Sequence, residues 1–185
     1  VRQTPEGDII PTIHGSGQTT FGELTGGGSP RCEAILAALA AGGVPCSISE
    51  NISDEMWMKF CAAAASFAIA AVMRVRAGVV AATQAGVGFV NAAYDECARI
   101  AVADGFTPPA GLKEIMLNLW TQPGSNYGPS LLADMENGRP TEGEQVIGDL
   151  ARRADRLGVD APFVRGALCS VQLYEARRRA KQANA

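Results

Sequence analysis

The sequence predicts a mainly α protein, with an all-helical domain over residues 51–185 preceded by a small β-α-β segment over residues 1–50. The longest apolar run extends from Glu55 to Met73, and the stretch around it, residues 53–77, contains neither Gly nor Pro, so we expect one helix of about six turns there. Helix start and stop signals then follow one another to the C-terminus. Short runs rich in β-branched residues lie before the long helix, which places the strands in the first segment.

The first segment carries its strand signals in three places. Asp8 to His14 and Gln18 to Leu24 are joined by Gly15-Ser16-Gly17, which predicts a hairpin. Ser29 and then Pro30 predict a helix over residues 30–41, closed by a pair of glycines. Val44 to Ser49 is a further predicted strand.

Two glycine clusters resemble a nucleotide fingerprint without completing it. Gly15-x-Gly17 is followed by Thr20, and Gly26-Gly27-Gly28 by Arg31, where the fingerprint has glycine. A phosphate site also needs its glycines between a strand and a helix start, and we expect neither cluster to lie there. Both clusters are predicted to be turns, and His14, the single histidine, a strand-end residue.

Lys59 is the one ionisable side chain within the apolar part of the long helix. Ser53 is expected to cap this helix, with Asp54 and Glu55 at the positive end of its dipole. Beyond Lys59 the helix is apolar on every face, which predicts burial. A lysine at this point either keeps its ammonium group in water or lines a cleft, where it can donate a proton or polarise a carbonyl group.

Proline and glycine divide the rest of the chain into helices. Pro129 and Pro162 each predict a helix start, Gly105 and Gly158 predict helix ends, and a capping box predicts one more start. The box pairs Thr141 with Glu144. The expected helices cover residues 81–104, 112–120, 129–136, 141–157 and 162–180.

The composition is that of a globular protein, with 47% hydrophobic and 19% charged residues. A net charge of −3 argues against a nucleic-acid or acidic membrane partner.

The apolar part of the long helix is expected to be too short to span a bilayer, and no signal peptide precedes it, so we expect a soluble cytoplasmic protein. One histidine and no paired cysteines predict no metal site. Scattered and odd in number, the cysteines are expected to be buried thiols of a reducing compartment: Cys32, Cys46, Cys61, Cys97 and Cys169.

Two motifs resemble those of one enzyme family. Glu55 to Phe60, with Trp57 two residues before Lys59, looks like the catalytic-lysine helix of the ketopantoate reductases (2-dehydropantoate 2-reductases). Ser130 to Met135, followed by Gly138 to Glu142, is similar to the family's serine-containing helix and Arg-x-Thr-Glu motif. The order of the two motifs and their separation in the chain also match those of the family. The resemblance covers essentially the whole chain.

The resemblance implies a fold and a set of roles. Residues 51–185 would form a helical domain like the C-terminal domain of 6-phosphogluconate dehydrogenase, and residues 1–50 the closing portion of a Rossmann-like nucleotide-binding domain. Lys59 would be the general acid, Ser130 would bind substrate, and Glu142 would help to hold the nicotinamide-side ribose of NADP. From position alone, Ser130 could equally be a solvated hydroxyl near a helix start, and Glu142 a carboxylate that stabilises a helix dipole.

Three positions depart from the family pattern. The reductases usually carry asparagines four and eight residues after the lysine, where this chain has Ala63 and Phe67, and a third where it has Ala77. A pocket without these amides leaves polar groups of ketopantoate unpaired, at about 1–3 kcal/mol each. We therefore expect a more apolar 2-oxo acid as substrate, or weak activity.

The function implied is that of the C-terminal part of an NADP(H)-dependent reductase of a small 2-oxo acid, such as ketopantoate in pantothenate and coenzyme A biosynthesis. The chain begins at Val1 and lacks the family's phosphate-binding loop, so we expect a truncated chain that is inactive alone. A homodimer is compatible with the resemblance. Two alternatives remain open: a non-catalytic helical dimerisation or interaction module, and a related lysine-dependent hydroxyacid dehydrogenase. The choice between NADPH and NADH depends on residues that we do not find here.

Overall fold

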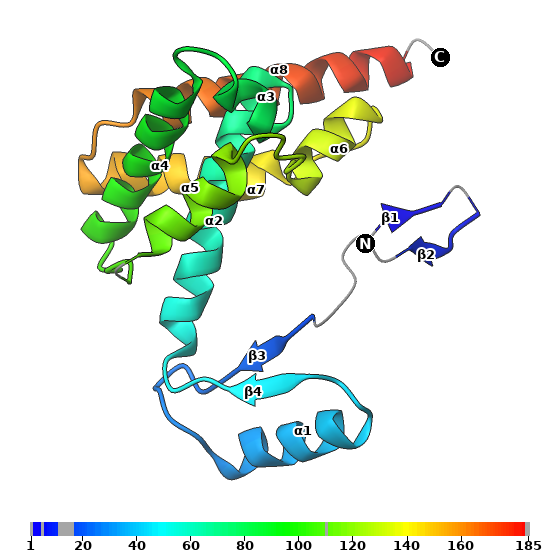
Figure 1. The fold of residues 1–185 in the computed structure, drawn as a ribbon, viewed down its shortest axis with the longest axis vertical. Helices are drawn as coiled ribbons and strands as arrows, with labels where there is room; N and C mark the ends of the chain where they lie inside the picture. Colours follow the sequence, from blue (N-terminus) through cyan, green and yellow to red (C-terminus); the bar gives the residue numbers. More distant parts are fainter. Residues whose placement is uncertain (1, 5, 11–16, 110, 184–185) are drawn as a thin grey trace. The chain divides into compact units, whose positions relative to one another are not determined.

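The computed structural model describes residues 2–4, 6–10, 17–109 and 111–183. The chain forms two compact units, Val1–Glu55 and Met56–Ala185. Helices dominate the described residues, so the predicted mainly α fold class is confirmed (Figure 1).

The first unit contains two short strand pairs and one helix. Strands β1 (Arg2–Gln3) and β2 (Ile9–Ile10) are antiparallel. Strands β3 (Thr19–Phe21) and β4 (Cys46–Ile48) are parallel, and helix α1 (Pro30–Ala41) makes the crossover between them. The unit therefore contains one β-α-β element, as the sequence predicts.

The predicted hairpin is wrong. The Gln18–Leu24 run contributes β3, which pairs with β4 rather than with the preceding run, and β2 pairs with β1. A strand that follows a crossover helix returns parallel to its partner, and this long-range pairing replaces the local turn. Residues 11–16, including His14 and most of the Gly15-Ser16-Gly17 turn, lie outside the described residues.

The second glycine cluster does lie between a strand and a helix start, contrary to expectation. Gly26 to Gly28 connect β3 to α1, whose first turn is capped by Ser29. The carboxylate of Glu23 accepts hydrogen bonds from Arg31 and from Ser29. These bonds, that from Arg31 first, lower the pKa of Glu23 to about 2. The carboxylate of Glu23 is therefore held by side chains at the start of α1.

The second unit is helical throughout and is built around α2, which passes through its middle (Figure 1). Helix α3 contacts α4 and α5, and α4 contacts α5, α7 and α8, while α7 and α8 pack along each other. The helices are α2 (Ile52–Met73), α3 (Ala77–Ala81), α4 (Gly86–Ala103), α5 (Leu112–Thr121), α6 (Ser130–Glu136), α7 (Gly143–Leu157) and α8 (Pro162–Ala183).

Helix α2 supplies the centre of the core. Its residues from Ala64 to Ala71 are all buried, and most of them are alanine, which lets neighbouring helices approach closely. With 22 residues it is long and apolar enough to cross a membrane, so the expectation that it is too short was wrong on length. Half of its most apolar stretch is buried inside the protein.

Both ends of α2 differ from the prediction. Asn51, not Ser53, caps its start, because the Asn51 side-chain oxygen accepts from the backbone N–H of Asp54 at 3.3 Å. The helix ends at Met73, since Arg74 has the left-handed φ of 57°. Residues 74–77 include neither Gly nor Pro, so no stop signal is present in the sequence before residue 78.

Two further predictions at helix starts need correction. The helix expected over residues 81–104 begins only at Gly86, as α4, and a separate short helix, α3, precedes it at Ala77–Ala81. The capping box does not form, because Thr141 donates to Glu175 instead and Glu144 accepts from Gln172. At α8, a residue that sequence reasoning did not single out takes the capping role: the buried Glu96 accepts from the backbone N–H of Val164 at 2.8 Å.

All five cysteines are free thiols. Cys32, Cys61 and Cys97 are buried, as expected, but Cys46 is half-buried and Cys169 is exposed. Burial raises the pKa of Cys61 to about 11 and that of Cys97 well above its ordinary value, so both thiols stay protonated.

We predict that Gly78→Ala destabilises the protein by about 1–3 kcal/mol. A Cβ atom at position 78 would lie well inside contact distance of the backbone of Ser125, which cannot move without shifting its loop. Urea denaturation followed by circular dichroism would measure the loss. Gly88→Ala is the control, because a Cβ there meets nothing within 4 Å and the site is inside α4. This control should be stabilised by roughly 0.5–1 kcal/mol; equal behaviour of the two variants would contradict the prediction.

Candidate functional site

Lys59 lies in the second turn of α2, just before the helix becomes buried. Its side chain is exposed, whereas Cys61 and the residues from Ala64 onward are buried. Across the residues that the structure describes, no hydrogen bond or ion pair occupies its ammonium group. The side chain is therefore available to a ligand or to solvent.

An aromatic cluster holds the turn of α2 on which Lys59 lies. The ring of Trp57 is stacked on Phe106, with centroids 5.9 Å apart, and meets Phe60 edge-on at 5.6 Å. The guanidinium carbon of Arg153, from α7, lies 4.8 Å from the Trp57 ring centroid. A cation–π contact of this kind contributes about 0.5–2 kcal/mol. The cluster fixes the start of the helix against α7.

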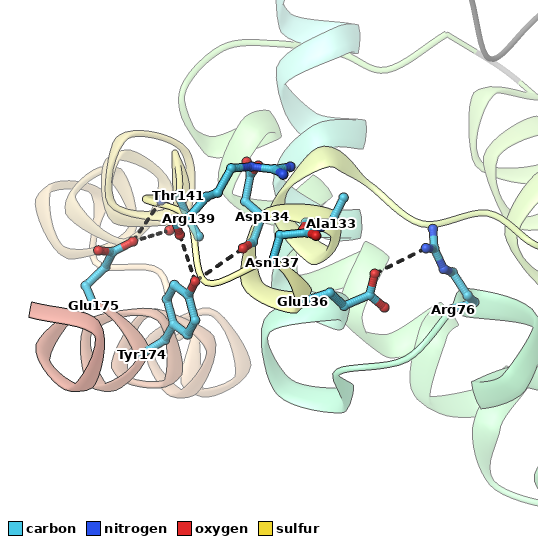
Figure 2. Close-up of polar contacts among 9 residues, drawn as sticks. All are labelled: Arg76, Ala133, Asp134, Glu136, Asn137, Arg139, Thr141, Tyr174 and Glu175. Atoms are coloured by element: carbon cyan, nitrogen blue, oxygen red, sulfur yellow. Dashed lines mark hydrogen bonds and ion pairs between the residues drawn. The ribbon is translucent and has the colours of Figure 1, made fainter. Parts of the chain in front are cut away.

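Ser130 is the first residue of α6 and its hydroxyl is exposed. The segment before it is tied to the start of α3, where the backbone N–H of Ala77 donates to the carbonyl of Tyr127 at 3.0 Å. At the far end of α6, Arg76 forms an ion pair with Glu136 at 3.3 Å (Figure 2). Both ends of the short helix are thus anchored to the same neighbouring segment.

Glu142 immediately precedes α7; its carboxylate is exposed and makes no capping bond. The residues before it are held by α8 (Figure 2). The hydroxyl of Tyr174 donates to the carbonyl of Arg139 at 2.7 Å. Glu175 accepts from the backbone N–H of Thr141 at 2.8 Å and from its hydroxyl at 3.0 Å.

The three predicted site residues do not contact one another within the described part of the chain. Ser130 and Glu142 lie at the two ends of one continuous segment, which consists of α6 and the turn after it. The α7 residue that reaches the start of α2 is Arg153, ten positions after Gly143, or about 15 Å along the helix axis. The turn of α2 that carries Lys59 is therefore contacted by the C-terminal half of α7, whereas Glu142 lies at the N-terminal end of α7.

The positions that depart from the family pattern carry apolar side chains in the folded protein. Phe67 is 7% exposed and Ala77 is 9% exposed, and both belong to the core, while Ala63 is half-buried. The only hydroxyl nearby on α2 is that of Ser66, which donates to the carbonyl of Ala63 at 3.0 Å. The helix face beyond Lys59 therefore offers no free amide.

A small pocket lies between the C-terminal half of α2 and the segment before α6. Its volume is about 10 Å³, roughly the space of one water molecule. Its wall includes Trp120, whose indole N–H has no partner among the described residues, like the hydroxyl of Tyr94 beside it. The lining residues are Ser66, Ile69, Ala70, Val75, Ala77, Trp120, Tyr127 and Pro129.

Within the described ranges, no group of three or more His, Cys, Asp or Glu side chains lies close enough to hold a metal ion. His14 lies outside those ranges.

Sequence reasoning missed Tyr174 and Glu175. Both continue a stripe of buried α8 residues, Val164, Ala167 and Val171, at helical spacing. Polar side chains on such a stripe need partners, which is the signal that could have identified them. The sequence offers no means to identify the partner segment itself.

The family model described as ketopantoate reductase PanE/ApbA, C terminal, matches residues 51–175. Among curated proteins, the chain is 29% identical over 158 residues to the uncharacterized oxidoreductase YkpB of Bacillus subtilis, covering 85% of this chain and 52% of that protein. It is 25% identical over 151 residues to a 2-dehydropantoate 2-reductase of Halobacterium salinarum, covering 82% and 50%. The chain spans about half the length of the curated relatives it matches.

A solved structure shares the fold. The crystal structure of 2-dehydropantoate 2-reductase from Methylococcus capsulatus matches with a TM-score of 0.72 and 28% identity, covering 85% of this chain and 50% of that one. The similarity therefore extends from the sequence motifs to the arrangement of the helices.

We predict that Asp104 makes stability depend on pH. A hydrogen bond from Arg153, supported by Arg156, holds the pKa of Asp104 below its usual range despite partial burial. Such a carboxylate stabilises the fold above its unfolded pKa of about 3.9 and loses that contribution as the pH falls through the lower folded value. The urea midpoint should therefore fall from pH 5 toward pH 3, and Asp104→Asn should reduce the fall. Asp160→Asn, at a side chain that is 90% exposed, is the matched control. The same acid dependence in the Asp104 variant and the parent would contradict this prediction.

Proposed function

The chain belongs to the ketopantoate reductase family through its C-terminal domain, and on this premise we propose that it is the C-terminal part of an NADP(H)-dependent reductase of a small 2-oxo acid. The observation that carries the proposal is Lys59, exposed and unpaired within the described residues, at the end of a buried apolar helix inside the matched span. In this proposal residues 1–50 close a nucleotide-binding domain and residues 51–185 form the substrate and catalytic domain. The β3-α1-β4 element supports the first assignment.

Lys59 is proposed as the general acid. Reduction of a 2-oxo acid adds a hydride to the carbonyl carbon, which a bound reduced nicotinamide would supply. The ammonium group of Lys59 gives a proton to the carbonyl oxygen as its negative charge develops, so that an N–H bond breaks and the O–H bond of the 2-hydroxy acid forms. The neutral amine then takes a proton from water. Before transfer, the positive charge of Lys59 also stabilises the polarised carbonyl group.

Ser130 and Glu142 are proposed to bind substrate and cofactor. The hydroxyl of Ser130 is exposed and can donate to a substrate oxygen. The carboxylate of Glu142 is exposed, makes no capping bond and can accept from two ribose hydroxyl groups. The proposed cofactor is NADP rather than NAD. Its other contacts would be made by residues other than Ser130 and Glu142.

The preferred substrate is proposed to have an apolar side chain. This part of α2 and α3 has no free amide, because it carries Ala63, Phe67 and Ala77, so the hydroxyl group of ketopantoate would lose hydrogen bonds to water without replacement. A branched-chain or aromatic 2-oxo acid has no such group to leave unpaired. Reduction of ketopantoate to pantoate, a step toward pantothenate and coenzyme A, is the alternative activity within this proposal.

A second candidate is a non-catalytic helical dimerisation module in the cytoplasm. Val79 on α3, with Ile115 and Leu119 on α5, are exposed apolar side chains on two helices in contact, which favours an interface with another copy. A related lysine-dependent hydroxyacid dehydrogenase would share Lys59 and differ in substrate.

One experiment separates these candidates. The full-length protein is mixed with NADPH or NADH and a panel of 2-oxo acids that includes ketopantoate, and loss of the reduced cofactor is followed by absorbance. Turnover with any member of the panel supports the reductase. The substrate that is reduced fastest then decides between an apolar 2-oxo acid and ketopantoate. No turnover, together with a stable dimer by light scattering, would favour the dimerisation module.

We predict that Lys59→Ala lowers kcat of the full-length enzyme by about 10²–10⁴-fold. The variant removes the proton donor, while the affinity for NADPH should stay nearly unchanged. Steady-state kinetics and fluorescence titration measure the two effects. Lys181→Ala, an exposed lysine near the end of α8, is the control. Unchanged turnover in the Lys59 variant would remove it from the catalytic role.

We predict that Ala63→Asn shifts substrate preference toward ketopantoate. Position 63 is half-buried and lies one turn beyond Lys59, so an amide there can meet a substrate hydroxyl. The ratio of kcat/KM for ketopantoate to that for an apolar 2-oxo acid should rise roughly tenfold, the value of one hydrogen bond. The apolar substrate serves as the internal control, and an unchanged ratio would place position 63 outside the substrate pocket.

A further inference from the structure

We propose that Tyr174 and Glu175, two consecutive residues of α8, are positioning residues that hold residues 139–141 and thereby set where Glu142 presents its carboxylate to the cofactor. The inference rests on the cofactor role proposed above for Glu142. Neither residue needs to touch a ligand.

The two side chains hold the segment at both of its ends. The hydroxyl of Tyr174 donates to the carbonyl of Arg139 at 2.7 Å, with the carbonyl of Asp134 also near, at 3.3 Å. Glu175 accepts two hydrogen bonds from Thr141, at 2.8 Å and 3.0 Å (Figure 2). Pro140 stands between these anchors, and its ring fixes φ. Little freedom is left in the backbone that leads to the next residue.

Glu175 is itself well held. Arg178, one turn along α8, donates to the second carboxylate oxygen of Glu175 at 2.9 Å. Burial raises the pKa of Glu175, but the hydrogen bonds from Thr141 and Arg178 outweigh burial and leave this pKa below the usual range. The carboxylate is therefore ionised at neutral pH, which strengthens its bonds to Thr141.

Helix α8 also fixes the residue after Glu142. A Cβ atom on Gly143 would come within 2.6 Å of the side chain of Val171, so α7 starts in close contact with α8. Val171, Tyr174 and Glu175 share one face of α8, at spacings of three and four. The backbone on both sides of Glu142 is thus fixed, whereas its own side chain is exposed and makes no capping bond. A fixed backbone with a free functional group is what a pre-organised ligand contact requires.

The same face of α8 contacts the helix that carries Lys59. The guanidinium of Arg74, just after α2, lies 5.3 Å from the centroid of the Tyr174 ring. Ser170 donates to the carbonyl of Ala71 at 2.7 Å. Helix α8 therefore contacts both the end of α2 and the segment that precedes Glu142.

The test uses the full-length protein and a double-mutant cycle. The variants are Glu175→Ala, Glu142→Gln and the two combined, with Tyr174→Phe as a milder change that keeps the ring and removes only the hydroxyl. Arg177→Ala, at an exposed neighbour on α8, is the control. The dissociation constant for NADPH is measured by fluorescence titration, with kcat and KM beside it, and thermal unfolding checks that each variant is folded.

We expect Glu175→Ala to weaken NADPH binding roughly tenfold, and Tyr174→Phe several-fold, while kcat at saturating cofactor changes much less. In the Glu142→Gln background, Glu175→Ala should cause little further loss, because its effect passes through Glu142. Glu175→Gln should recover most of the affinity, since its amide oxygen can accept the same bonds from Thr141.

The outcomes separate the two proposals. Suppose that Glu142→Gln weakens NADPH binding but Glu175→Ala does not, or that Glu175→Ala weakens it just as much in the Glu142→Gln background as alone. In either case the positioning role is wrong and the cofactor role of Glu142 stands. A loss of thermal stability without a change in affinity also overturns the positioning role. If Glu142→Gln leaves NADPH binding unchanged, the cofactor role of Glu142 is wrong and the positioning inference falls with it.

Discussion

Burial of the apolar stretch of α2 is the constraint on which the helical unit depends. From Ala64 to Ala71 every residue of α2 is buried, so other helices must cover it on all sides. Removing such a stretch from water is the dominant favourable term in folding. Its alanines let the covering helices approach closely. Burial also restricts where charged side chains can lie, because those of α2 are accommodated only outside its buried stretch.

Lys59 and Arg74 mark the two ends of that buried stretch. Lys59 precedes it and is exposed beside an aromatic cluster; Arg74 follows it and lies on the ring of Tyr174. Each end is held by a guanidinium on an aromatic ring, Arg153 on Trp57 in one case and Arg74 on Tyr174 in the other. The core helix is thereby tied at one end to α7 and at the other to α8.

Burial explains how the fold of the family can be kept although Phe67 and Ala77 depart from the family pattern. The side chains of Lys59, Ser130 and Glu142 lie outside the core and are exposed. Phe67 and Ala77, in contrast, belong to the core, where an apolar side chain fits without cost. An apolar residue is therefore accommodated at these two positions while the fold is kept.

The sequence by itself determined the fold class, the order of the helices and the motifs that identify the family. Those features depend on local signals: Ser29 and Pro30 at the start of α1, Gly158 at the end of α7, and the apolar run of α2 all act within a few residues of where they stand. Local signals misled where a long-range contact replaced the local one, as in the hairpin that the β3–β4 pairing replaced and the capping box that Glu175 displaced.

Only the tertiary structure decided which distant side chains meet. Glu175 contacts Thr141, 34 positions away, and Glu96 caps α8 at Val164, 68 positions away. Such a contact forms because packing of the core brings two segments together and then requires each buried polar group to find a partner. A linear pattern can reveal that a polar residue lies on a buried face, but the partner is chosen by the packing of the whole unit.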